Sequence, residues 1–315
     1  MKPPRLAFVF CLFQCFAALA QTTRPMPQVD RVLIISIDGL RPDVLMRANT
    51  RTLHGLIERG SFSLWAQTVP VAITLPSHVS MLTGVSVRKH GIDFNDERAT
   101  TQPIYPRATT LFEVAHQAGL TTALVTGKSK FAVFTRPGVI DWAWTPENSK
   151  TTDAEVADMA GAIFRLHKPQ VMFVHFPGGD TAGHAFGWDS PEQLSAYAGI
   201  DDAIGMILRG LDNSGLSQST IVIVSADHGG SGRTHGANDP RSLYIPWIAA
   251  GPGVVQGQDL TRFRELTIHT EDTFATACYI LGLTPPPGVD GKPILQIFPR
   301  KELLQDAPTT LPVGE

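Results

Sequence analysis

The sequence predicts an α/β protein, a three-layer sandwich with a mostly parallel central sheet. Five short apolar runs rich in β-branched residues alternate with segments of helical periodicity. Continuous apolar runs are typical of strands buried on both faces, and therefore of a largely parallel sheet covered by helices. A hydrophobic content of 43% with 17% charged residues is that of a globular protein with a sizeable core.

The expected strands follow one another along the chain. They are V-L-I-I-S-I (32–37), T-A-L-V-T (122–126), V-M-F-V-H-F (171–176), I-V-I-V-S-A (221–226) and I-P-W-I-A-A (245–250). Two segments between them, residues 111–119 and 153–166, have helical periodicity. A further helix is expected after Ser190, because this cap residue is followed by Pro191 in the first turn and by Gln193 three positions on.

The segment T-L-P-S-H-V-S-M-L-T-G (74–84) raises a separate question. Pro76 can open a helix, which would place the Thr74 hydroxyl at the amino end of that helix. Unpaired N–H groups and the positive end of the helix dipole favour an anion there. A lone threonine at such a position is more often a helix cap than a nucleophile, so other residues have to decide.

The first twenty residues are typical of a secretory signal. Lys2 and Arg5 precede an apolar run, and A-L-A before Gln21 fits a small-residue cleavage site. The run is short for the alternative, an uncleaved membrane anchor. We therefore expect a cleaved signal peptide over residues 1–20 and a periplasmic or secreted protein without a membrane span. No linker divides the remainder, so residues 21–315 are expected to form a single catalytic domain.

Charge and cysteine content exclude some functions. A formal net charge of -3 argues against a surface that coats nucleic acid, which needs a marked basic excess. An anionic substrate would have to be held by local charge, such as metal ions or a few lysines. Cys11 and Cys15 lie in the expected signal, and Cys278 lies in an apolar helical pattern, where we expect an inert core residue.

Metal-ligand side chains recur where the expected strands end. Asp38 ends the first strand, Asp180 follows the third, and Asp227 and His228 end the fourth. Ligands of open α/β sheets bind outside the carboxyl ends of strands, and three carboxylates on one rim would repel one another without a cation. Taken singly, D-T-A-G-H could be a turn and D-H-G-G a strand-end cap.

His184 and His235 extend this set to six side chains. Imidazole combined with carboxylate suits zinc, and six ligands suffice for two ions with three protein ligands each. Two ions about 4 Å apart would stabilise both the attacking and the leaving oxygen of an in-line displacement at phosphorus. One of them could also convert the Thr74 hydroxyl into an alkoxide nucleophile.

These residues lie in an ordered series of short motifs. The series is D-G (38–39), T-L-P-S-H-V-S-M-L-T-G (74–84), H-G-I (90–92), D-T-A-G-H (180–184), A-D-H-G-G (226–230) and T-H-G (234–236). It resembles the alkaline phosphatase superfamily, and within it the type I phosphodiesterase/nucleotide pyrophosphatase family. The sulfatase branch is excluded, because T-L-P-S-H stands where that branch carries C/S-x-P-S-R.

The resemblance implies a dizinc hydrolase of phosphodiester or pyrophosphate bonds, and the expected signal peptide implies that it is exported. Its ligand set for one zinc ion would be Asp180, His184 and His235, and for the other Asp38, Asp227 and His228, with Thr74 as an additional ligand. Thr74 would also be the nucleophile, in two in-line steps through a covalent phospho-threonine. Asn95, in H-G-I-D-F-N, would support a non-bridging phosphate oxygen; without the resemblance it would be interpreted as a turn residue.

Lys128 and Lys130, in V-T-G-K-S-K-F, leave other substrates open. A similar lysine pair occurs in the phosphonoacetate hydrolases of this superfamily, so the pair could bind a second anionic group of a phosphoryl or phosphonyl substrate, or could lie in an ordinary solvated turn. C–P bond hydrolysis is therefore one alternative.

Phosphate monoester hydrolysis is another alternative, although neither Arg41 nor Arg88 matches the arginine with which some monoesterases bind the additional negative charge of a monoester. The non-enzymatic alternative, an inactive zinc-binding protein, is disfavoured by an intact Thr74 and six ligands.

Only six residues separate His228 from His235, where nucleotide pyrophosphatases that act on large substrates usually carry a long insertion. Any cap over the site is therefore expected to be small and built from loop insertions, residues 93–108 or 128–150. His78 is expected to buttress the turn that carries Thr74. The tryptophans Trp142, Trp144 and Trp188 are expected to fill the core.

Overall fold

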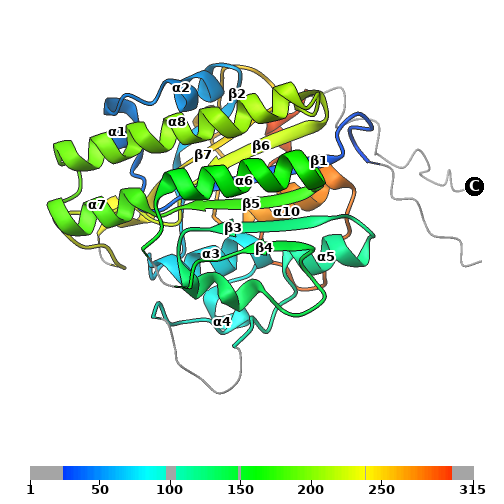
Figure 1. The fold of residues 1–315 in the computed structure, drawn as a ribbon, viewed down its shortest axis with the longest axis horizontal. Coiled ribbons are helices and arrows are strands. Elements are labelled where there is room, and N and C mark those ends of the chain that lie inside the picture. Colours follow the sequence, from blue (N-terminus) through cyan, green and yellow to red (C-terminus); the bar gives the residue numbers. More distant parts are fainter. Residues whose placement is uncertain (1–23, 97–103, 148–149, 238, 300–315) are drawn as a thin grey trace, which may run out of the picture.

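The computed structural model describes residues 24–96, 104–147, 150–237 and 239–299, and the expected signal peptide lies outside these ranges. The strands within them are β1 (Arg31–Ile37), β2 (Gly60–Gln67), β3 (Thr122–Thr126), β4 (Trp142–Trp144), β5 (Val171–Phe176), β6 (Thr220–Ser225), β7 (Tyr244–Ala250) and β8 (Gln258–Asp259). They form one eight-stranded sheet in the order β4-β3-β5-β1-β6-β7-β2-β8 (Figure 1).

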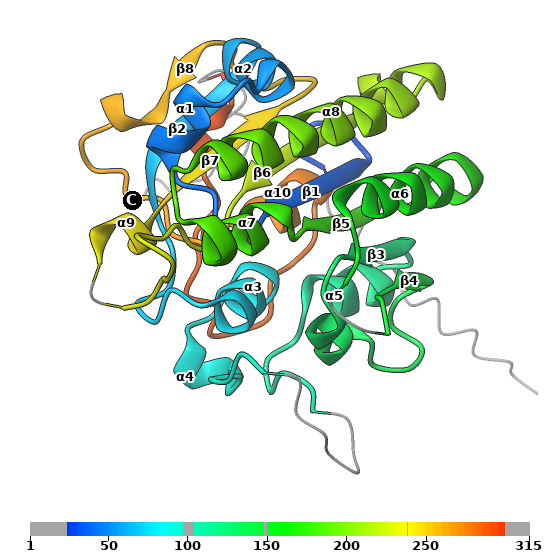
Figure 2. The ribbon, with the colours of Figure 1, turned by 60° about the vertical axis from the view of Figure 1, so that its left-hand side comes forward.

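The helices of the described residues are α1 (Pro42–Arg47), α2 (Arg51–Glu58), α3 (Thr74–Thr83), α4 (Val87–His90), α5 (Leu111–Gln117), α6 (Asp153–His167), α7 (Gly178–Phe186), α8 (Pro191–Asn213), α9 (Pro240–Leu243) and α10 (Asp272–Leu281). Short 3₁₀ turns occur at Ser129–Phe134, Ser217–Ser219, Leu260–Arg262 and Leu295–Ile297. Helices α6 and α8 cover one face of the sheet, and α3 and α10 cover the other (Figures 1 and 2). This arrangement confirms the three-layer α/β sandwich.

Strand β7 alone runs against the other seven strands of the described sheet. The neighbouring strands from β4 to β6 are mutually parallel, whereas β7 pairs antiparallel with both β6 and β2, and β2 is parallel to β8. Its apolar run I-P-W-I-A-A is nevertheless continuous, because residues 245–250 are buried. Such a run reports burial on both faces and not strand direction.

Local signals start the main helices where the sequence predicts. The Ser190 hydroxyl accepts a hydrogen bond from the Gln193 N–H (3.2 Å) at the start of α8. Thr110 with Glu113, and Thr152 with Glu155, form reciprocal capping boxes at α5 and α6. Such a cap contributes about 0.5–2 kcal/mol, which is enough to define where a helix begins.

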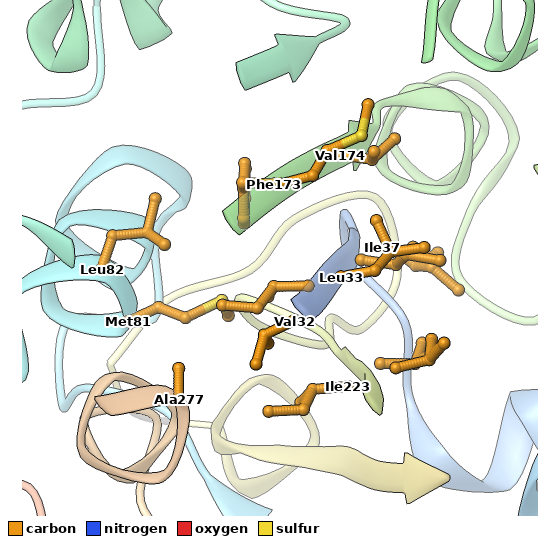
Figure 3. Close-up of a cluster of buried hydrophobic side chains, with 14 of the residues drawn as sticks. Val32, Leu33, Ile37, Met81, Leu82, Phe173, Val174, Ile223 and Ala277 are labelled. Atoms are coloured by element: carbon orange, nitrogen blue, oxygen red, sulfur yellow. The ribbon is translucent and has the colours of Figure 1, made fainter. Parts of the chain in front are cut away.

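The core lies between the sheet and its helices. Figure 3 shows Met81 of α3 and Ala277 of α10 packed against Val32 of β1 and Ile223 of β6, and all four side chains are essentially inaccessible to solvent. Complete burial of a large apolar side chain is worth roughly 1.5–3 kcal/mol. This packing keeps the carboxyl ends of the central strands in fixed positions.

The thiol of Cys278 is buried in α10, and burial raises its pKa to about 12, so the expectation of an inert core residue is confirmed.

Trp188 is also buried, whereas Trp142 and Trp144 are half-buried against the core in the edge strand β4. Residues 142–144 therefore belong to the main sheet, and a small cap from other parts of 93–108 or 128–150 stays a prediction. No helix in the described ranges is both long and apolar enough to cross a membrane.

Candidate metal centre

The acidic and histidine residues singled out in the sequence meet at one edge of the sheet. Strand β1 lies between β5 and β6, and all three are parallel, so their carboxyl ends share this edge. The six side chains form two groups, each able to offer three ligand atoms within 4.8 Å of one another. We refer to Asp38, Asp227 and His228 as the strand-end group, and to Asp180, His184 and His235 as the helix–loop group.

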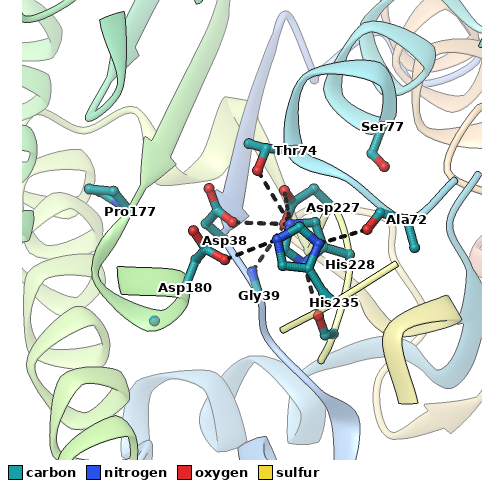
Figure 4. A network of polar contacts seen from close by, with 12 residues as sticks. Asp38, Gly39, Ala72, Thr74, Ser77, Pro177, Asp180, Asp227, His228 and His235 are labelled. Carbon is teal, nitrogen blue, oxygen red and sulfur yellow. Dashed lines mark hydrogen bonds and ion pairs between the residues drawn. The ribbon is translucent and has the colours of Figure 1, made fainter. Parts of the chain in front are cut away.

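The strand-end group is fully buried. Asp38 follows β1, and Asp227 and His228 follow β6, its direct neighbour. The His228 Nε2 lies 3.1 Å from Asp227 Oδ2 and 3.4 Å from Asp38 Oδ1, while its Nδ1–H donates to the Gly229 carbonyl (2.9 Å) (Figure 4). The backbone N–H of Gly39 donates to Asp227 Oδ1 (3.1 Å), which orients that carboxylate.

The helix–loop group combines two residues of α7 with one from the loop after β6. D-T-A-G-H is helical here, so Asp180 and His184 share a face, with His184 Nε2 3.3 Å from Asp180 Oδ1. His235 Nε2 lies 3.6 Å from the same oxygen. The Nδ1 atoms of His184 and His235 donate to the carbonyls of Arg233 (2.9 Å) and Ala72 (2.8 Å), respectively. Each imidazole thus presents Nε2 towards the carboxylates, the arrangement usual for metal-binding histidines.

The carboxylates of the centre have unsatisfied oxygens. Asp38 Oδ1, Asp180 Oδ1 and Asp227 Oδ2 are buried without a hydrogen-bond partner. A buried, unpaired carboxylate oxygen is costly unless a cation compensates it. Three such oxygens facing three bare imidazole nitrogens fit a pair of divalent ions, and the mixed nitrogen and oxygen donors suit zinc.

Lys128 supplies one positive charge between the groups. Its buried ammonium donates to Asp38 Oδ2 and to Asp180 Oδ2, 2.7 Å in each case. Burial opposes the charged form, but the two carboxylates raise the pKa of Lys128 above its ordinary value. One ammonium cannot balance three carboxylates, so the centre still favours further cations.

The protonation states follow from burial and from these neighbours. Burial would raise the pKa of Asp38, but Lys128 and the hydrogen bond with His175 (2.9 Å) hold it well below its usual range. Burial and the charge of Asp38 raise the pKa of Asp227 well above its usual range. Burial and His235 lower the pKa of His228 to about 4, which keeps this imidazole neutral, as a metal ligand must be.

Thr74 lies at the first position of α3, at the helix amino end expected for it, and its hydroxyl is 3.3 Å from His228 Nε2 (Figure 4). His78 donates from Nδ1 to the Thr74 carbonyl (2.8 Å) and accepts at Nε2 from the Ser36 hydroxyl (2.7 Å). The expectation that His78 buttresses this turn is confirmed by these contacts. Ser36, whose side chain orients His78, was not anticipated, because only the register of β1 beneath α3 brings the two together.

Asn95 lies beside the same helix end. Its Oδ1 accepts from the Leu75 N–H (2.9 Å) and from the Lys130 ammonium (3.2 Å), which also donates to the Asn95 carbonyl (2.6 Å). Both partners are donors, so the Asn95 NH₂ is the part of the carboxamide left to meet an acceptor. Burial and the charge of Lys128 lower the pKa of Lys130.

An α/β sandwich with two adjoining carboxylate–imidazole groups and a hydroxyl at a helix amino end is consistent with a binuclear metal site. Residues 32–235, well over half of the chain, match the Type I phosphodiesterase / nucleotide pyrophosphatase family. The protein therefore belongs to this family, within the alkaline phosphatase superfamily.

Curated relatives agree with this assignment. An uncharacterized pyrophosphatase/phosphodiesterase of Schizosaccharomyces pombe is 27% identical over 214 residues, which cover 63% of this chain and 44% of the relative. The human bis(5'-adenosyl)-triphosphatase is 26% identical over 214 residues, covering 63% of this chain and 47% of that protein. The chain thus spans less than half the length of these two relatives.

A solved structure shares the fold at low sequence identity. The murine ectonucleotide pyrophosphatase/phosphodiesterase 5, in an inactive variant with alanine in place of a threonine and in complex with AMP, superposes with a TM-score of 0.67 at 16% identity. The superposition covers 82% of this chain and 96% of that one.

Proposed function

We propose that the protein is an exported dizinc hydrolase that cleaves phosphodiester or pyrophosphate bonds through a covalent phospho-threonine. The observation that carries the proposal is a pair of carboxylate–imidazole groups, of which the strand-end group approaches the Thr74 hydroxyl at the amino end of α3 through His228 (3.3 Å). Family membership and the nucleotide substrate in the human relative's name support the substrate class. Export rests on residues 1–20 of the sequence.

Zinc would be held by the strand-end group with Thr74 and by the helix–loop group. Bound there, two ions supply Lewis acidity at the phosphoryl oxygens and lower the pKa of the nucleophile and of water. The chain's own residues do the positioning. His78 and Ser36 fix the turn that aims Thr74, and the Nε2 of His228 lies 3.3 Å from the Thr74 hydroxyl, so that both would face the same ion.

We propose that Asn95 donates from its NH₂ to a non-bridging phosphoryl oxygen, because its Oδ1 is already held by Leu75 and Lys130. A donor fixed before the substrate arrives costs no reorganisation in the transition state. Direct binding of a second anionic group by Lys128 and Lys130 stays a prediction: each ammonium has protein partners here, Lys128 the two aspartates and Lys130 Asn95.

The test of the proposal compares an aryl phosphodiester, an aryl phosphomonoester, a nucleotide ester and phosphonoacetate in parallel, with zinc content measured on the same sample. We expect the diester and the nucleotide ester to turn over fastest. Turnover of phosphonoacetate alone would replace the proposal with C–P bond hydrolysis. A monoester hydrolysed much faster than the diester would indicate a phosphatase, and two bound zinc ions without any turnover would indicate an inactive zinc-binding protein.

Thr74→Ala tests the nucleophile. We expect turnover to fall by roughly 10⁴-fold or more while zinc content is retained, because the hydroxyl is removed and the six other ligands stay. Thr83→Ala is the matched control: Thr83 lies buried at the other end of α3, where its hydroxyl donates to the Val79 carbonyl. Equal activities of the Thr74 and Thr83 variants would reject the assignment.

A further inference from the structure

The first turn of α7 is held by side chains from two other helices. This turn begins with Gly178 and Gly179 and carries Asp180, the residue through which the helix–loop group approaches Lys128 and Asp38. A displacement of this turn would therefore move a metal ligand directly. Residues outside the metal centre determine its place.

On one side, the half-buried Asp153 at the start of α6 holds the turn. Its Oδ1 accepts the backbone N–H of Gly178 (3.0 Å). A Cβ added to Gly178 would lie 1.9 Å from Asp153 Oδ2, so the carboxylate occupies the place that a side chain would take. A carboxylate at a helix amino end also interacts favourably with the helix dipole.

On the other side, α8 closes the turn. Gln193 Nε2 donates to the Gly179 carbonyl (3.1 Å), and a Cβ on Gly179 would lie 2.2 Å from the Tyr197 ring. The first turn of α7 is thus enclosed between α6 and α8, with a hydrogen bond on each side. Gln193 thus has two roles: its Oε1 accepts the Asp189 N–H (2.7 Å) at the capped start of its own helix, as expected, and its Nε2 bonds α7.

An ionised Asp153 at this place destabilises the folded state, which a purely structural contact would not require. Burial raises its pKa to about 6, and the negative charge of Asp38 adds to this rise, so keeping the group ionised near neutral pH opposes folding. A carboxylate held at such a place, beside glycines that leave no room for a side chain, points to a role in the geometry of its neighbour.

We propose that Asp153 is a positioning residue that fixes the start of α7 and so aims Asp180 into the helix–loop group. It touches no metal ligand: its effect passes through the Gly178 N–H. The inference rests on the metal centre of the proposed function. Through Asp153, α6 contributes to how tightly the helix–loop group holds its ion relative to the strand-end group.

The experiment measures the two zinc affinities separately, by stepwise titration of metal-free protein against a competing chelator. We assign the weaker of the two binding steps to the helix–loop group and the tighter one to the strand-end group. For Asp153→Ala, we expect the affinity of the weaker step to fall about 10- to 100-fold, the range typical for loss of a residue that orients a metal ligand, while the affinity of the tighter step is unchanged. Asp153→Asn keeps an oxygen that accepts the Gly178 N–H and should restore most of the affinity. Gly178→Ala, which displaces the carboxylate, should weaken the same step.

Glu155→Ala is the matched control. Glu155 lies in the same first turn of α6 but closes the capping box with Thr152 and does not contact α7. Its replacement should lower the melting temperature and leave both zinc affinities unchanged. An equal loss of the weaker step in the Glu155 and Asp153 variants, or no loss in Asp153→Ala, would overturn the proposal.

The outcome is separable from that of the proposed function. Wild-type protein that binds two zinc ions but hydrolyses no phosphoryl ester would refute the activity, and the affinities of the variants would still decide the role of Asp153. Wild-type protein that binds fewer than two ions would overturn both.

Discussion

The strand-end group and the helix–loop group present the same side-chain types on different supports. The strand-end group extends two hydrogen-bonded neighbours, β1 and β6, and all its side chains are fully buried. In the helix–loop group, the His184 side chain is 45% exposed, and His235 comes from a loop. Ends of paired strands in a packed core move little, whereas a helix start and a loop are easier to displace. We therefore expect the two groups to hold an ion with different strength, although each offers three carboxylate and imidazole ligands.

Ligand replacement should have the largest effect and should differ between the groups. Asp227→Asn should lower turnover by roughly 10⁴-fold, because the ion of this group would also bind the Thr74 nucleophile, whereas His184→Ala should cost about 10²-fold and one zinc equivalent. Metal analysis together with kcat measures both. Identical losses in the two variants would show that the two groups contribute equally to catalysis. His116→Ala, on the surface of α5, is the control for histidine removal.

Metal removal should then proceed in two phases. Dialysis against a chelator is expected to release one zinc equivalent quickly, from the partly exposed helix–loop group, and the second slowly. Metal content sampled over time, with activity measured in parallel, follows both phases. Release of both equivalents in one phase would show that burial of the strand-end group gives no kinetic protection.

The side chains beside Thr74 should give intermediate effects. Asn95→Ala is expected to lower kcat by about 10²-fold with unchanged zinc content, because it removes one preorganised donor. Lys130→Met should cost less, about 10-fold, since Leu75 still holds the carboxamide. The double variant should lose little more than Asn95→Ala alone, because Lys130 acts through Asn95. Full additivity of the two losses would instead indicate that Lys130 contacts the substrate itself.

The smallest effect concerns His90, which contacts α3, the helix that carries Thr74 beside the strand-end group. The buried His90 bonds Ser80 of α3 (3.0 Å), and burial lowers its pKa to about 4. The unfolded chain binds the proton near pH 6.5, so the contribution of His90 is complete above that pH and is lost as the pH falls towards 4. From pH 7 to pH 5, this amounts to about 2 kcal/mol.

Urea unfolding of wild-type protein and His90→Gln at both pH values measures this contribution. On acidification, the free energy of unfolding should fall less for the variant than for the wild type. The affinity of its weaker zinc-binding step should be unchanged. A variant with the same pH dependence as the wild type would show that His90 is not held neutral by its place beside α3.

Much of the fold was readable from the sequence. Each of the five apolar runs forms a strand, and Ser190 begins a helix as expected. Strand β2 was missed because its side chains are only partly buried, in the pattern of a half-covered strand with a bulge between Ser63 and Ala66. Strands β4 and β8 have three and two residues, too few for any periodicity to show.

The sequence by itself determined the burial of the strands and the order of the metal-ligand motifs, because both are properties of residues close together in the chain. Only the tertiary structure decided the direction of β7, the place of Lys128 between two aspartates, and the contact of Asp153 with α7. These features join residues that are distant in the chain, and no local pattern contains them. The same carboxylate or ammonium acquires its role from the neighbours that folding brings within hydrogen-bond distance.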